Sequence, residues 1–209
     1  DSIGSIIHIR TKEAEKPGVH GKIILDPVIP LFPTIYCESA ISDFSLIFAG
    51  RRTYIDWGAD FFEADNSDTW YFQDHYLKLK YNLTPRHRLY FTTLGSDDFI
   101  SMKDDLDART QYHIESLKWQ YLINRKVFLE TSFLRNRTNH YIKDMDTDSA
   151  DEPLSINYSP LMYRLLQTLT ADLSVFDIKT GYEFILHKYG VSGKDRKSTR
   201  LNSSHFVPS

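Results

Sequence analysis

The chain is poor in the features that define several large classes of protein. Its 209 residues contain one cysteine, Cys37, so an internal disulfide is excluded. A formal net charge of −3 gives no electrostatic reason to expect a nucleic-acid partner. No apolar run approaches the ~20 residues of a membrane-spanning helix. A β-barrel stays possible, because its strands are only about half apolar.

Motifs for catalysis and metal binding are also missing. The eight histidines show no metal-site spacing, and no Ser-His-Asp set, glycine-rich phosphate loop or pair of catalytic carboxylates occurs. We therefore expect no enzyme, no catalytic residue and no cofactor. Asp144, Asp146 and Asp148 alternate as in a calcium loop, but Ser149 stands where that loop needs glycine. This favours a solvated loop there and in the acidic segment Asp97–Asp107, and predicts no metal site.

What the chain does have is a repeated alternation of apolar and polar residues. Tyr76–Leu83 places Leu77, Leu79, Tyr81 and Leu83 on one side and Lys78 and Lys80 on the other. A period of two over such lengths is typical of strands with one apolar and one polar face. The same pattern occurs in Val19–Leu25, Thr34–Glu38, Asp43–Thr53, Arg88–Leu94, Gln111–Ile123, Lys126–Arg137, Leu161–Leu173 and Ile178–Lys188. The sequence predicts an all-β antiparallel meander of about nine strands.

The connections alternate in length along the chain. Those near Ile41, Pro85, Asn124 and Phe176 are short, whereas longer segments such as Tyr54–Asp74 are acidic and flanked by aromatics. Short turns at one end and long loops at the other are typical of an outer-membrane barrel. Aromatic rings where strands meet long loops predict an interfacial girdle made of Tyr54, Trp57, Trp70, Tyr71, Phe72, Tyr141 and Tyr158.

A soluble β-sandwich or a soluble up-and-down barrel would show the same alternation. Strands of ten or more residues exceed the usual five to six, which counts against both, as does the regular change in loop length. A sandwich predicts that the apolar side of Tyr76–Leu83 packs on a second sheet of this chain. The fold class we predict is a partial, incomplete transmembrane antiparallel β-barrel.

Two motifs resemble a known family. Gly4–Lys12 resembles the last strand of the plug domain of TonB-dependent outer-membrane receptors, and Phe48–Asp56 is similar to a barrel strand in a branch of that family. The resemblance runs from about Ser2 to Ser192. It implies that residues 1–12 end the plug, 13–18 are a linker and 19–192 begin the barrel, so that the chain is a fragment of a longer receptor.

The same resemblance implies a function and partners. The receptors carry a scarce nutrient of the siderophore, cobalamin, glycan or peptide class across the bacterial outer membrane. Their partners are outer-membrane lipid and the TonB–ExbB–ExbD complex, which is reached through a segment missing here. A passive outer-membrane porin or structural barrel, or a soluble carbohydrate-binding β-sandwich, stays as an alternative. Asp195–His205 resembles translated sequencing-adapter sequence, so we expect 193–209 to be a non-native or disordered tail.

Five basic residues are candidates for the lumen wall or for contact with a plug. Arg51 and Arg52 are adjacent, so on a strand they point to opposite faces. One of them then faces the lumen, or else it reaches lipid headgroups or a neighbouring carboxylate. Lys78, Lys80 and Arg164 lie on the polar sides of their predicted strands and fit a polar lumen wall.

Overall fold

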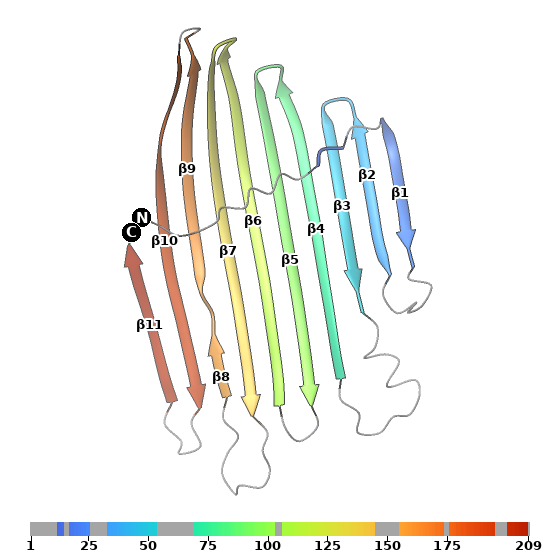
Figure 1. The fold of residues 1–209 in the computed structure, drawn as a ribbon, viewed down its shortest axis with the longest axis vertical. Coiled ribbons are helices and arrows are strands. Elements are labelled where there is room, and N and C mark those ends of the chain that lie inside the picture. The colour runs from blue at the N-terminus through green and yellow to red at the C-terminus, as the bar shows by residue number, and fades with distance from the viewer. Residues whose placement is uncertain are drawn as a thin grey trace, which may run out of the picture.

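The protein is a single curved antiparallel sheet, seen face-on in Figure 1. The computed structural model describes residues 12–14, 17–25, 33–53, 69–102, 106–144, 155–173, 176–194 and 200–208. The strands are β1 (Gly18–Ile24), β2 (Thr34–Ile41), β3 (Phe44–Arg52), β4 (Thr69–Thr84), β5 (His87–Met102), β6 (Leu106–Asn124), β7 (Val127–Asp144), β8 (Ser155–Tyr158), β9 (Leu161–Asp172), β10 (Asp177–Lys194) and β11 (Arg200–Pro208). The predicted all-β antiparallel class is therefore confirmed.

The strands follow one another across the sheet in chain order. β8 and β9 share one position between β7 and β10, separated by Ser159 and Pro160. The ordered path begins at β1 and ends at β11, and these two edges do not pair with each other in the described part of the chain. The sheet is thus an open meander. The described residues include no helix that could cross a membrane.

The alternation of the sequence gives the sheet two different faces. On one, which we call face A, seven neighbouring strands place a large apolar residue in the same row: Leu46, Leu79, Phe91, Leu117, Phe133, Leu165 and Phe184. On the other, face B, the adjacent row contains Lys80, Tyr90, Lys118 and Ser132. Opposed residues of an antiparallel pair share a face, so these rows are continuous surfaces.

No part of the chain that the structure describes covers the apolar row of face A. Leu117 and Phe184 are each 51% exposed although both belong to interior strands. Ile47 is the only apolar residue that is fully buried among those the structure describes. Tyr81 and Leu83, which a sandwich would cover with a second sheet, are 47% and 49% exposed. That requirement of the sandwich alternative is not met.

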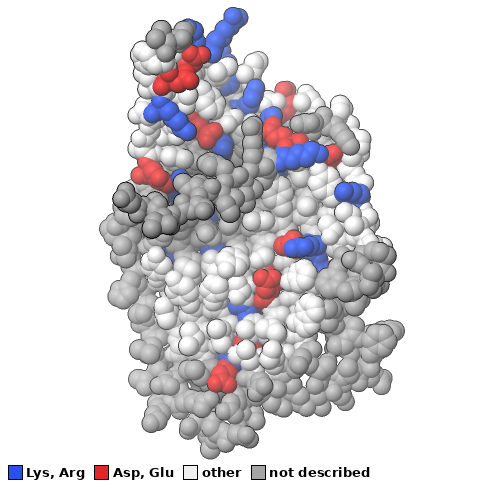
Figure 2. All heavy atoms as spheres, in the orientation of Figure 1, with Lys and Arg blue, Asp and Glu red and all other residues white. Residues whose placement is uncertain are grey.

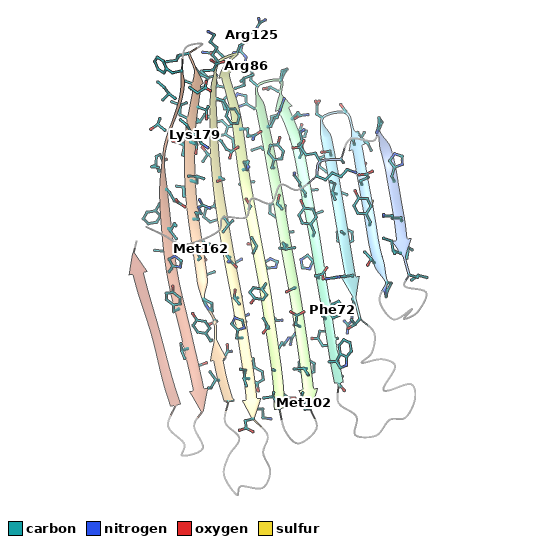
Figure 3. All side chains as sticks on the ribbon, viewed as in Figure 1. Phe72, Arg86, Met102, Arg125, Met162 and Lys179 are labelled. Carbon is teal, nitrogen blue, oxygen red and sulfur yellow. The ribbon has the colours of Figure 1, made fainter. Side chains whose placement is uncertain are left out.

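The short turns gather at one end of the sheet, where Arg86 and Arg125 are labelled in Figure 3; Met102 lies at the opposite end. Side chains fix two of these turns: the Thr84 hydroxyl accepts from the N–H of Arg86 and His87, and Asn124 Oδ1 accepts from the N–H of Lys126. We call the half of the sheet next to these turns the turn half and the other the connection half.

Three expectations about where strands begin or occur need correction. Asp97–Asp107 is not a loop, because only residues 103–105 separate β5 from β6. The segment Tyr54–Asp74 gives way to β4 already at Thr69. The 193–209 segment was expected to lack a strand, yet Arg200–Pro208 pair with β10 in the register Lys194–Arg200 to Leu186–Pro208. That this segment is non-native stays a prediction. The expected plug strand, residues 1–12, lies almost wholly outside the described residues.

Candidate solute-binding hollow

The polarity of both faces reverses between the two halves of the sheet. In the connection half, face B carries an apolar row across five neighbouring strands: Trp70, Ile100, Ala108, Ile142 and Ile156. Face A instead carries Gln73, Asp97, Gln111 and Asn139 in one row. The alternation of each strand continues through this change, but the side that is apolar is exchanged.

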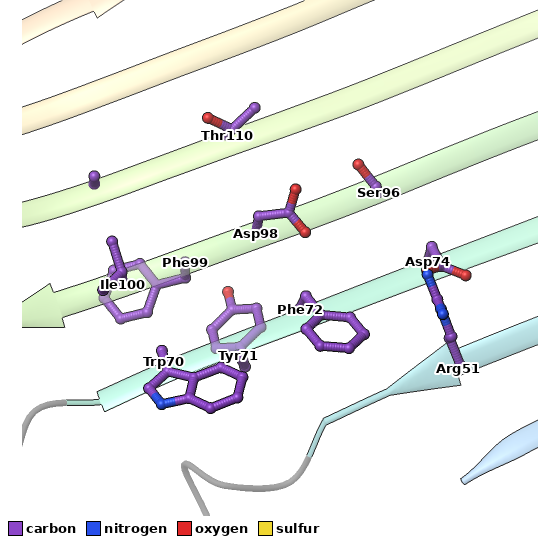
Figure 4. A pocket seen from close by; sticks show the side chains of 11 residues that line it. Arg51, Trp70, Tyr71, Phe72, Asp74, Ser96, Asp98, Phe99, Ile100 and Thr110 are labelled. Atoms are coloured by element: carbon purple, nitrogen blue, oxygen red, sulfur yellow. The ribbon is translucent and has the colours of Figure 1, made fainter. Parts of the chain in front are cut away.

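A hollow of about 620 Å³ lies on this apolar part of face B (Figure 4). β3, β4, β5 and β6 supply its wall. The rings of Trp70 and Phe72 lie along one side, and Asp98 and Thr110 face them from the neighbouring strands. Trp70 is 39% exposed, so its ring is available to a ligand.

The charges in the hollow are close to its aromatic rings. Arg51 Nε donates to Asp74 Oδ2 over 2.5 Å, and its guanidinium carbon lies 5.3 Å from the centre of the Phe72 ring. Burial raises the pKa of Asp98, and the nearby Asp97 and Asp74 carboxylates raise it further. Flat rings beside paired charges suit the binding of a ligand with an apolar face and polar edges. The residues that line the hollow supply no nucleophile with an adjacent base.

The turn half of face B is charged instead, and residues 12–14, which we call the N-terminal segment, lie on it. Figure 2 shows acidic and basic side chains gathered towards the short turns. Lys12 Nζ donates to Glu38 Oε2 over 2.9 Å, and Lys80 Nζ donates to Glu13 Oε2 over 2.7 Å. Lys78 Nζ reaches the main-chain oxygen of Lys12 at 3.3 Å. Glu38 is 3% exposed, so the segment is held partly by a buried carboxylate.

Four of the five basic candidates share face B. Lys78 and Lys80 hold the N-terminal segment, Arg51 belongs to the hollow, and Arg164 pairs with Glu183 of β10. Arg52 points to face A, where its guanidinium carbon lies 5.0 Å from the centre of the Tyr71 ring. The two adjacent arginines therefore do lie on opposite faces.

The aromatic residues expected to form one girdle lie on both faces. Tyr71 and Tyr141 are on face A, in the row of Arg109, whereas Trp70, Phe72 and Tyr158 are on face B. Tyr54 and Trp57 lie outside the described residues. The described members of the predicted girdle are thus divided between the two faces, and the girdle itself stays a prediction.

The weak calcium candidates are not brought together in the part of the chain that the structure describes. Asp144 ends β7, and Asp146 and Asp148 lie outside the described residues. No group of three or more histidine, cysteine or carboxylate side chains that could hold a metal occurs among the residues described.

One cluster was missed by reasoning from the sequence. Asp97 on face A accepts from Arg109 Nε at 2.8 Å, Arg109 Nη2 at 2.5 Å and Gln111 Nε2 at 3.3 Å, and its side chain is 10% exposed. The donation from Arg109 lowers the pKa of Asp97. Gln111 is the direct cross-strand partner of Asp97, and Arg109 lies two residues further along β6 on the same face, so the cluster depends on the pairing register of β5 with β6.

Comparisons with protein-family descriptions, with curated proteins and with solved structures found nothing that matches this chain. The geometry of the two faces and the resemblance of the two motifs are therefore the observations that bear on function.

Proposed function

We propose that this chain is the plug–barrel junction and the first barrel strands of a TonB-dependent receptor of the bacterial outer membrane. In this proposal face A contacts lipid and face B lines the lumen. The hollow around Trp70 and Phe72 contributes to the wall that receives a scarce nutrient on its way across the membrane. Energy for transport comes from the TonB complex through a segment outside this chain.

The observation that carries the proposal is the uncovered apolar row of face A. Leu46 to Phe184 form a continuous apolar stripe on seven strands, and its central members are about half exposed. Water is a poor solvent for such a stripe, because each Å² of apolar surface costs about 25 cal/mol. Lipid removes this cost, and the backbone of the interior strands is already hydrogen-bonded within the sheet as lipid requires.

Two features of face B support a receptor over a passive porin. A porin keeps its polar inner face open to water. Here Lys12 and Glu13 lie on that face and form ion pairs with Glu38 and Lys80. Residues 12–14 lying against the inner wall are what a plug linker requires. The hollow further along the same face gives a solute an aromatic surface.

Solute binding tests the proposal. The chain would be folded into lipid vesicles as the double variant Trp57→Phe/Trp119→Phe, which leaves Trp70 as the fluorescent residue. A catecholate siderophore, cyanocobalamin, a malto-oligosaccharide and a short peptide would be titrated in turn. We expect one class to change the fluorescence with saturation, and Phe72→Ala to weaken that binding severalfold. Lys118→Gln, on face B but in the turn half, is the matched control and should leave it unchanged. If none of the four binds, the proposed function is wrong.

A further inference from the structure

A second hollow, of about 320 Å³, lies on face A where its apolar stripe ends. Its lining includes His75 from β4, His113 from β6, and Arg135 and Arg137 from β7. His75, Gly95, His113 and Arg137 form one row across four neighbouring strands, which we call the basic row.

Arg137 is the unbalanced charge of this hollow. The carboxylates here already have partners: Glu115 Oε2 accepts from Arg135 Nη1 over 3.0 Å and Glu115 Oε1 contacts His113 Nε2 at 3.0 Å, while Arg109 holds Asp97. Arg137 is exposed and forms no ion pair within the described residues. One full positive charge is therefore left facing outward, whatever the state of the two histidines.

Gly95 makes the hollow possible. A Cβ at this position would lie 2.3 Å from Cε1 of His75, so the imidazole occupies the space that a side chain would take. The rings of His75 and His113 are thereby brought to 6.1 Å between their centres, on the two sides of β5. The ring nitrogens of His75 have no hydrogen-bond partner among the residues that the structure describes. They are free to donate to a ligand that lies beside Arg137.

The position of the basic row points to a lipid headgroup. It lies four residues from the apolar row on each strand: Leu79 to His75, Leu117 to His113 and Phe133 to Arg137. Four residues span about 13 Å of strand. Charged groups are costly in hydrocarbon and are placed where it ends, at the level of the headgroups. The next row along, with Gln73, Asp97, Gln111 and Asn139, is wholly polar, which agrees with a boundary here.

We propose that this hollow binds the phosphate of a lipid headgroup in the leaflet on the side of the long connections. The guanidinium of Arg137 binds two phosphate oxygens through its fork of N–H groups. An imidazole N–H of His75 donates to a third, whereas Nε2 of His113 is held by Glu115 Oε1 at 3.0 Å. The inference rests on the proposed function, since it takes face A to be the lipid-facing side.

The test uses the 209-residue chain in phosphatidylcholine vesicles that contain spin-labelled phosphatidic acid, with spin-labelled phosphatidylcholine as the reference lipid. Electron paramagnetic resonance gives the fraction of each labelled lipid that is immobilised on the protein. We expect phosphatidic acid to be preferred at least threefold, and Arg137→Gln to remove most of that preference. Arg137→Lys keeps the charge but loses the fork, so an intermediate preference is expected. Arg86→Gln, the same loss of charge at the other end of the sheet, is the matched control.

Three results would overturn the inference: no preference for phosphatidic acid, equal preferences in the Arg137→Gln and wild-type chains, or full competition by millimolar inorganic phosphate, which would identify a site for the free ion instead. In parallel vesicles, quenching by brominated acyl chains of the variant Trp57→Phe/Trp70→Phe, whose one tryptophan is Trp119, reports insertion. If Trp119 is quenched and the preference is absent, only the headgroup site is wrong. If Trp119 is not quenched, the proposed function itself fails.

Discussion

The turn half and the connection half of the sheet are made of the same strands, yet their faces have opposite character. On β6, Leu117 and Trp119 point to face A and Lys118 to face B, while Gln111 points to face A and Ala108 to face B. A sheet with one wet and one dry side keeps the same side apolar along its whole length. The exchange partway along β4 to β7 is what the proposed membrane boundary would produce, because the surroundings of each face would change there.

The largest effect should come from a charge placed on face A of the turn half, the side that we propose contacts lipid. Leu117→Arg is expected to destabilise the vesicle-folded chain by about 2–4 kcal/mol, the cost of arginine in the apolar band of a barrel. Ser116→Arg, one residue away on face B, should cost less than about 1 kcal/mol. Urea titration in vesicles measures both. Equal losses for the two variants would contradict the assignment of the faces.

The next effect concerns neighbouring carboxylates on opposite faces of the connection half. Asp97→Asn removes a charge held by Arg109 and should cost about 1.5 kcal/mol, as expected for a hydrogen bond to a charged group. Asp98→Asn should be neutral or slightly stabilising at pH 7, because burial already disfavours the charge of Asp98. Unfolding curves of the two variants measure both changes in stability. A larger loss of stability for Asp98→Asn than for Asp97→Asn would be inconsistent with the two environments.

Acidification should affect these two carboxylates with opposite sign. The pKa of Asp97 is lowered, so its stabilising effect is complete above the ordinary aspartate pKa of 3.8 and is lost as the pH falls through the lowered value. The pKa of Asp98 is raised, so its charge destabilises the sheet at neutral pH, and that cost disappears as the pH falls through the raised value. The stability difference between wild type and Asp98→Asn should therefore shrink on acidification before that of Asp97→Asn does.

A smaller effect is expected where the N-terminal segment lies on the charged turn half of face B. Glu38→Gln weakens the contact with Lys12 and should speed trypsin cleavage after Lys12 about threefold, the scale of one weak ion pair. Glu130→Gln is the control, because Glu130 pairs with Lys118 on the same face. Mass spectrometry of timed digests gives both rates. If both variants are cleaved like the wild type, Glu38 does not hold the segment.

The smallest effect is local to a short turn. Ser42 has φ 51°, a left-handed backbone that glycine adopts at lower cost. Ser42→Gly should therefore stabilise the sheet by about 0.5 kcal/mol, and Ser45→Gly within β3 should destabilise it by a similar amount. Chemical unfolding of the two variants checks the signs. A loss of stability in Ser42→Gly would show that the turn does not have this conformation.

The sequence predicted the turn half of the sheet better than the connection half. Tyr76–Leu83 and Gln111–Ile123 were identified because leucine and aromatic residues alternate there with lysine or glutamine. Such an alternation has one physical origin, a strand that separates an apolar environment from a polar one. The first half of β4 and the second half of β5 were taken for loops, because acidic residues and the exchange of the apolar side interrupt that pattern.

The candidate site could be predicted only in part. The adjacency of Arg51 and Arg52 was enough to place them on opposite faces, since neighbouring side chains of a strand alternate. The hollow of Trp70, Phe72 and Asp98 depends on the pairing register of β4 with β5, and a shift of one residue would send the side chains of the shifted strand to the other face. The basic row depends on Gly95 lying beside His75, a contact set by pairing of β4 with β5 and visible only in the folded sheet.

Depth-dependent quenching of Trp119 and Trp70 tests the central claim most directly. Single-tryptophan chains that keep one or the other would be folded into vesicles whose lipids carry bromine at known depths, and acrylamide would be added to the water phase. We predict that acyl-chain bromine quenches Trp119, which lies on face A in the turn half, and that acrylamide quenches Trp70 on face B. Quenching of Trp119 by acrylamide alone would contradict the account, because face A would then lie in water.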